Sequence, residues 1–171
     1  MRTARDIDPT AFAELVGGRA VVVGLLETPG ALAAVDEVVA VPGLDELHIG
    51  INDLGLALGL ANRFLVLARD DVAAAAGAAA AVGKRFGAGG IGRARDERFP
   101  VAADLVYAQL ARLDSGAALL SRSFTGGAGD LAGDVRRARE RLAWWRSRPQ
   151  AELDAARAAL VAQATRSGVP F

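Results

Sequence analysis

The chain has 171 residues, and 52% of them are hydrophobic, which is enough for one domain with a core of its own. It carries 20 basic and 20 acidic residues, so no net charge attracts nucleic acid or an anionic membrane. The absence of cysteine excludes disulfides and thiolate metal sites. The first 16 residues lack the apolar stretch of a secretory signal, and no run of 18 uncharged apolar residues occurs, so we expect a cytoplasmic protein without a membrane span.

The first third of the chain alternates between helix and strand signals. A proline at the start and two glycines at the end predict a helix over residues 9–16. Residues 19–27 form a continuous valine-rich run, which is typical of a strand buried on both faces. A second helix is expected over residues 29–41, and the sequence DELHIGI at 45–51 predicts a second buried strand.

The remainder of the chain continues this alternation. We expect, in chain order, a helix within 70–82, a glycine-rich strand and loop at 84–92, a helix over 100–113, a strand at 117–124, a GGAGD loop at 126–130, and helical structure over 130–167 with a break near Pro149. Strands that alternate with helices favour an α/β fold, in which a parallel sheet is joined by right-handed crossovers. We divide the chain into a β/α domain at 1–129 and a C-terminal helical extension at 130–171, which packs on that domain or on a partner subunit.

Two apolar segments each end on a carboxylate. Glu27 follows the first predicted strand, and Asp53 follows the second, within the sequence ELHIGINDLG. Parallel strands place their C-terminal ends on one edge of the sheet, so the two acids are expected in one crevice. Adjacent carboxylates repel each other, and a divalent cation such as Mg²⁺ or Mn²⁺ relieves that repulsion. The alternative is that each acid caps a helix or lies in a solvated loop.

The sequence LLETPGALAAVDEVVAVPGLDELHIGINDLGLALGL, residues 25–60, resembles the metal-binding core of the HpcH/HpaI aldolase and citrate lyase β-subunit family. The later segments FGAGGIGR and LLSRSF extend the resemblance over about residues 19–124. The resemblance implies a (β/α)8 barrel in which Glu27 and Asp53 hold Mg²⁺ or Mn²⁺. It also implies a lyase or aldolase that acts on a 2-oxo acid or an acyl-CoA-type substrate through a metal-stabilised enolate, with Gly50, Ile51 and Asn52 near the substrate carboxylate.

The chain supplies four of the eight strands of such a barrel, and these resemble strands five to eight. Four strands leave open edges and cannot close a barrel. We therefore expect either a homo-oligomer or a separate chain that provides the N-terminal half-barrel. A truncated product remains a third interpretation, and a non-catalytic half-barrel subunit or scaffold is the alternative to an active enzyme.

Three other features are candidates for the site. His48, the only histidine, is a candidate general base, although a packed and hydrogen-bonded histidine is the favoured interpretation. Arg93 is a candidate ligand for a substrate carboxylate or a CoA phosphate, and a solvated loop arginine is the alternative. The glycines of GAGGIG at 87–92 lack the setting of a dinucleotide-binding turn, and in a barrel they would let a substrate approach the backbone.

The sequence DVRRARERLAWWRSR at 134–148 combines arginines with two tryptophans. A nucleic-acid surface is one interpretation. Apolar residues recur here at helical spacing, which favours a packing or interface helix with arginines on its exposed face; these residues are Leu131, Val135, Ala138, Leu142 and Trp145.

Overall fold

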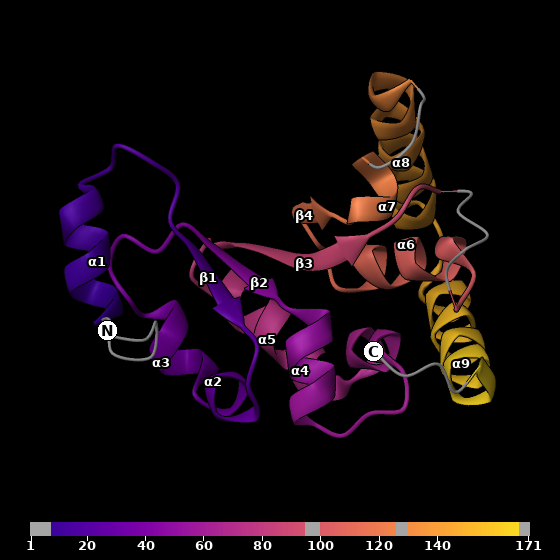
Figure 1. The fold of residues 1–171 in the computed structure, drawn as a ribbon, viewed down its shortest axis with the longest axis horizontal. Helices are drawn as coiled ribbons and strands as arrows, with labels where there is room; N and C mark the ends of the chain where they lie inside the picture. Colours follow the sequence, from indigo (N-terminus) through magenta and orange to yellow (C-terminus); the bar gives the residue numbers. More distant parts are fainter. Residues whose placement is uncertain (1–7, 95–99, 126–129, 168–171) are drawn as a thin grey trace.

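The computed structural model describes residues 8–94, 100–125 and 130–167 (Figure 1). Four parallel strands form one sheet in the order β1-β2-β3-β4, which is also their order along the chain. The strands are β1 (Val23–Leu26), β2 (Glu46–Ile49), β3 (Arg85–Ile91) and β4 (Ala117–Leu120). The predicted α/β class and the parallel sheet are confirmed.

Helices connect the strands and extend the C-terminal end. They are α1 (Pro9–Val16), α2 (Pro29–Ala33), α3 (Val35–Val39), α4 (Ile51–Ala57), the 3₁₀ helix η2 (Arg63–Ala68), α5 (Asp70–Ala81), α6 (Ala103–Arg112), α7 (Arg122–Thr125), α8 (Leu131–Arg146) and α9 (Gln150–Ser167). None of the described helices has the length and hydrophobicity needed to cross a bilayer.

Local caps explain where the first helices begin. The Asp8 carboxylate accepts a hydrogen bond from the Thr10 N–H at 2.9 Å, and the Thr28 hydroxyl accepts one from the Ala31 N–H at 3.1 Å. Each cap is followed by proline at the first helical position, where a missing N–H costs nothing. Gly17 ends α1 with a φ of 54°, in the left-handed region that glycine tolerates. The predicted starts of both helices are confirmed.

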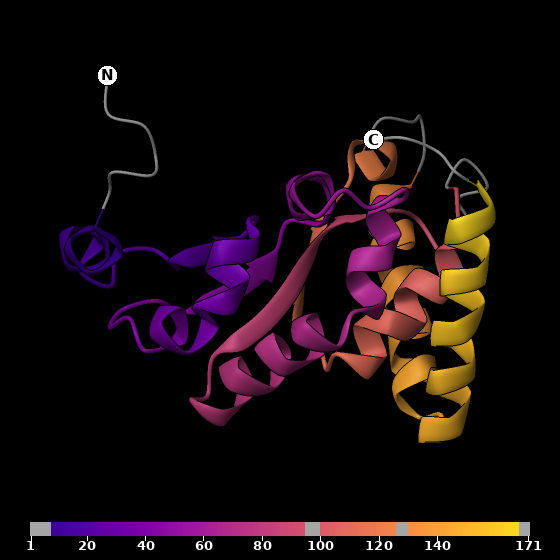
Figure 2. The ribbon, with the colours of Figure 1, turned by 90° about the horizontal axis from the view of Figure 1, so that it is seen from below.

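The two faces of the sheet differ in what covers them. Helix α5 runs along one face, beside β3 (Figure 2). The strand side chains on that face are buried, including Leu47, Ile49 and Phe86. Strand alternation places the partners Leu25, His48 and Gly87 on the opposite face.

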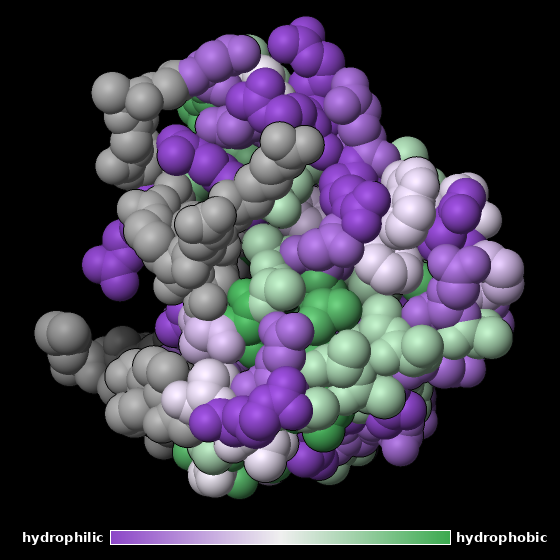
Figure 3. Space-filling model, turned by 90° about the vertical axis from the view of Figure 1, so that its right-hand side faces the viewer, coloured by the Kyte–Doolittle hydropathy of each residue, from purple (hydrophilic) through white to green (hydrophobic). Residues whose placement is uncertain are grey.

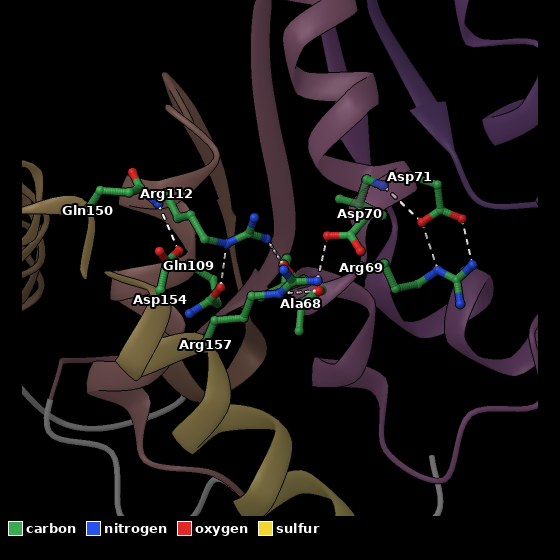
Figure 4. A network of polar contacts seen from close by, with 11 residues as sticks. Ala68, Arg69, Asp70, Asp71, Gln109, Arg112, Gln150, Asp154 and Arg157 are labelled. Atoms are coloured by element: carbon green, nitrogen blue, oxygen red, sulfur yellow. Dashed lines mark hydrogen bonds and ion pairs between the residues drawn. The ribbon is translucent and has the colours of Figure 1, made fainter. Parts of the chain in front are cut away.

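The C-terminal helices belong to the same core as the sheet. Helices α8 and α9 both pack on α6, and Leu160 of α9 is fully buried. Arg157 of α9 donates to the Ala68 carbonyl at 2.7 Å and to the Asp70 carboxylate at 2.6 Å, which joins α9 to the start of α5 (Figure 4). On the face formed by these helices, hydrophilic side chains gather over the upper part and a hydrophobic strip crosses the middle (Figure 3).

The expected packing stripe of α8 is present over most of its length. Trp145 is buried, and Ala138 and Leu142 pack against the core, whereas Leu131 is exposed. The Trp145 indole donates to the Asp104 carboxylate of α6 at 3.1 Å, and Arg141 also pairs with that carboxylate. The helix is therefore fastened to α6 by a charged contact as well as by its apolar stripe.

Both edge strands differ from the prediction. The structure gives β1 four residues instead of the run 19–27, and Val23 and Leu25 are exposed, so the prediction of a strand buried on both faces is wrong. The reason is that β1 pairs on one side only and helices cover one face only. Strand β4 ends at Leu120, not at residue 124, because the chain turns there into α7.

Other helical segments also differ from the prediction. Helices α4 and η2 occupy apolar sequence for which no helix was predicted, and Ile51 lies in α4 instead of the preceding strand. The helix expected over 29–41 is divided into α2 and α3 at Ala34. Helix α6 begins at Ala103, later than Pro100. Most of the GGAGD loop, residues 126–129, lies outside the described residues.

Candidate metal-binding site

The two acids singled out from the sequence lie at the C-terminal ends of neighbouring strands. Glu27 directly follows β1, and Asp53 lies in the first turn of α4, which directly follows β2. Because β1 and β2 pair in parallel, both acids lie at the same edge of the sheet. Asp53 is presented by a helical turn and not, as expected, by the strand end itself.

Both carboxylates line one small pocket of about 160 Å³. Its other walls come from the four strands and from the start of α4, namely Leu25, Ile49, Gly50, Ile51, Asn52, Gly89, Gly90 and Leu119. The structure therefore brings Glu27, Asp53 and the candidate substrate-binding residues Gly50, Ile51 and Asn52 together. It also adds the glycines of β3, which let the pocket reach the backbone of that strand.

Gly50 makes room for the Glu27 side chain. A Cβ atom at Gly50 would lie 2.5 Å from the Glu27 Cγ and 2.6 Å from its Oε1, closer than real Cβ atoms approach other atoms. Any other residue at position 50 would therefore displace the carboxylate or the backbone. This steric role has no signal in a single sequence, because it depends on how β1 and β2 align.

The charge state of Glu27 reflects its surroundings. Burial raises the pKa of the Glu27 carboxyl above its usual 4.5, and the nearby charge of Asp53 raises that pKa further. Both effects penalise the ionised form, since a carboxylate loses water on burial and repels a second carboxylate. A bound cation would reverse the second effect and offset the first.

His48 lies on the face of the sheet that also carries Leu25, its partner on β1, but it does not line the pocket of Glu27 and Asp53. Its side chain is 3% exposed, and its Nε2 lies 3.0 Å from the Glu46 carboxylate, which also pairs with Arg85 of β3. A Cβ atom at Gly87 would lie 2.6 Å from that Nε2, so the ring occupies space left by this glycine. The Nδ1 atom is buried and has no hydrogen-bond partner among the described residues.

Arg93 is engaged elsewhere in the described structure. Its Nε lies 2.9 Å from the Asp134 carboxylate of α8, and its Nη2 donates to the Phe124 carbonyl at 3.0 Å. These contacts join the segment after β3 to α7 and α8. The structure does not bring Arg93 into the pocket that Glu27 and Asp53 line.

The side chains in the pocket suit a hard divalent cation. Carboxylate oxygens are the ligands that Mg²⁺ and Mn²⁺ prefer, and Mg²⁺ is commonly held by one or two carboxylates while water and substrate oxygens complete its shell. Within residues 8–94, 100–125 and 130–167, no cluster of three or more His, Cys, Asp or Glu side chains is placed to bind a metal. The pair Glu27 and Asp53 therefore offers two ligands and leaves the other positions to water and substrate.

Neither a scan against models of protein families nor a search of curated proteins finds a significant match to this chain.

Proposed function

We propose that this protein is a metal-dependent carbon–carbon lyase or aldolase, a half-length relative of the HpcH/HpaI aldolase and citrate lyase β-subunit family. In this proposal β1 to β4 correspond to strands five to eight of a (β/α)8 barrel. The observation that carries it is that Glu27 and Asp53 line one pocket at the C-terminal edge of adjacent parallel strands, which is where enzymes with such sheets bind their ligands.

The residues of the pocket have distinct parts in this proposal. Glu27 and Asp53 hold Mg²⁺ or Mn²⁺, and Gly50 leaves the space in which Glu27 is positioned. Ile51 and Asn52 begin α4 and lie against the carboxylate of a 2-oxo acid or an acyl-CoA-type substrate. The cation supplies Lewis-acid stabilisation of the negative charge that develops on the substrate as a carbon–carbon bond breaks or forms.

A calorimetric titration of the full chain with Mn²⁺ tests the metal site. We expect saturable binding in the wild type and its loss in Asp53→Ala, while Asp36→Ala, which changes an exposed acid on α3, binds as the wild type does. Turnover of oxaloacetate or of a 4-hydroxy-2-oxo acid, with and without Mn²⁺, then tests the reaction. The proposal fails if the wild type binds no metal, or if binding survives in Asp53→Ala.

A second candidate function is a non-catalytic half-barrel subunit that needs a partner chain. The observation that favours it is the open wall of the pocket, where Leu25 and Leu119 belong to the two edge strands and are exposed. Metal binding by the isolated chain without turnover of either substrate would favour this function over the enzyme.

A further inference from the structure

The exposed hydrophobic residues of this protein are concentrated at the two edges of its sheet. Val23 is 40% exposed at the β1 edge, and Leu119 is 49% exposed at the β4 edge. Leu25 is also exposed on β1, and Leu120 is also exposed on β4. The chain that leads into β1 leaves three further large hydrophobic side chains exposed, namely Phe12, Leu15 and Val21. Scattered exposed residues need no explanation, but such a concentration marks a surface that is covered in the working protein.

Within the described residues, β1 is hydrogen-bonded on one side only. The carbonyls of Val22 and Leu26 accept hydrogen bonds from the Glu46 and Gly50 N–H groups, in and directly after β2. In a parallel ladder alternate residues face the neighbouring strand, so Val23 and Leu25 turn their N–H and C=O groups away from β2. A free strand edge of this kind pairs readily with another strand. A closed barrel of parallel strands needs a parallel partner at each of the two edges.

In the middle of the uncovered face, the one carboxylate of β2 has partners. The Glu46 carboxylate pairs with Arg85 and lies 3.0 Å from the His48 Nε2. Around this cluster the face is apolar, with Val23 and Leu25 on one side and Leu119 on the other. A second apolar surface can therefore pack against this part of the face without leaving the Glu46 carboxylate buried and unpaired.

Apolar surface is also exposed on the helices at both ends of the described sheet. Helix α1, which precedes β1, leaves Phe12 exposed and Leu15 73% exposed. At the β4 edge there is a hollow of about 290 Å³ between β4, α6 and α8, lined mainly by apolar residues that include Leu120, Phe124 and Leu142. Helix α1 thus exposes apolar side chains, and the β4 edge has an apolar hollow that could receive such side chains.

We propose that two copies of this chain close into one eight-stranded parallel barrel, with β1 of each copy paired to β4 of the other. A two-fold axis along the barrel keeps all strands parallel and satisfies both edges of both copies, so the ring closes without leaving an edge for further growth. Helix α1 of each copy then covers the hollow beside β4 of its partner. The partner copy then encloses the pocket of Glu27 and Asp53, which Leu25 and Leu119 line from the two edge strands.

Sedimentation velocity of the purified full chain is the first test. We expect a species of twice the 17.6 kDa of one chain. Val23→Glu, which places a charge on the inner face of β1, should shift it to a single chain. Val161→Glu changes a valine of similar exposure, 38%, on α9 and should leave the dimer intact. A wild-type chain that sediments as one copy overturns the proposal and points to a different polypeptide as the missing half.

Disulfide trapping then tests which edges meet, because the natural chain has no cysteine. Within one copy β1 and β4 are separated by two strands, roughly 14 Å, which is beyond the reach of a disulfide. Val23→Cys combined with Leu119→Cys should therefore give a covalent dimer on oxidation, and each single variant should not. A second pair, Val21→Cys with Ala117→Cys, allows for a different register.

The outcomes separate this proposal from the metal chemistry. If the chain is a dimer but neither cysteine pair cross-links, the copies associate through another surface and the barrel is wrong. Because these measurements need no metal and no substrate, their failure leaves the Mn²⁺ titration to decide the proposed function on its own.

Discussion

At the scale of single residues, Gly50 decides where Glu27 can lie. We predict that Gly50→Ala weakens Mn²⁺ binding by about tenfold or more, because a Cβ atom there would overlap the Glu27 side chain and move a metal ligand out of place. Calorimetric titration of wild type and variant measures the change. The matched control is Gly77→Ala in the middle of α5, where an added Cβ meets nothing within 4 Å. Equal Mn²⁺ affinity in wild type and Gly50→Ala would show that Glu27 is not a ligand.

The raised pKa of Glu27 makes a prediction about stability without metal. The folded carboxyl holds its proton more tightly than the unfolded one, so ionisation of Glu27 destabilises the fold at pH values above its folded pKa. Glu27→Gln removes that ionisation, and we expect it to raise the Tm at pH 7. The gain should fade as the pH falls through the raised pKa and vanish below the ordinary value of 4.5.

Thermal unfolding at pH 7 and pH 4, in the presence of a chelator, measures this difference. Glu37→Gln changes an exposed acid of α3 and should leave the Tm unaltered. If Glu27→Gln instead lowers the Tm at pH 7, the ionised Glu27 carboxylate stabilises the metal-free protein, and repulsion from Asp53 does not destabilise it.

The sequence identified part of this pocket and missed part of it. Glu27 and Asp53 could be placed together because a parallel sheet brings all strand C-termini to one edge, which follows from the order of elements alone. The space that Gly50 leaves for Glu27, and the wall that Leu119 supplies, depend on register and on distant strands. Such contacts have no periodicity along the chain, so no local pattern reveals them.

At the scale of elements, the secondary structure that was predicted correctly had local signals in the sequence. Caps fixed the starts of α1 and α2, and composition located all four strands. The two helices between Ile51 and Ala68 were not predicted, because a short apolar run fits a strand, a helix or a buried 3₁₀ turn equally well. Tertiary packing decides among these, and η2 exists because its apolar residues, such as Phe64 and Leu67, are fully buried.

The burial of α9 predicts that this helix unfolds together with the sheet. Leu160 is fully buried within the same core as the sheet residues, so Leu160→Ala should lower the free energy of unfolding by about 2–5 kcal/mol. The neighbouring Val161 is exposed, and Val161→Ala should change that free energy by less than about 0.5 kcal/mol. Urea unfolding followed by circular dichroism measures both. Equal, small effects would mean that α9 is a separate appendage.

At the scale of the whole molecule, the helix-covered face of the sheet carries the core, and the open face carries the polar cluster and the pocket. Helices α5 and α6 pack on the covered face, and α8 and α9 pack in turn on α6, which explains how a short chain builds a core around only four strands. The open face holds the Glu46, His48 and Arg85 cluster and leads to the pocket of Glu27 and Asp53 at its C-terminal edge. The covered face therefore provides the core, and the open face leads to the site of the proposed chemistry.

This division predicts that metal binding and turnover respond differently when the assembly is broken. Both proposed metal ligands come from one chain, on the neighbouring strands β1 and β2, and Val23 does not line the pocket. We therefore expect Val23→Glu to retain Mn²⁺ binding while losing turnover of a 2-oxo acid, since an open pocket cannot exclude water or receive groups from the partner copy. Val161→Glu should retain both properties. Parallel loss of binding and turnover in Val23→Glu would contradict this, and would mean that closure of the barrel also shapes the pair Glu27 and Asp53.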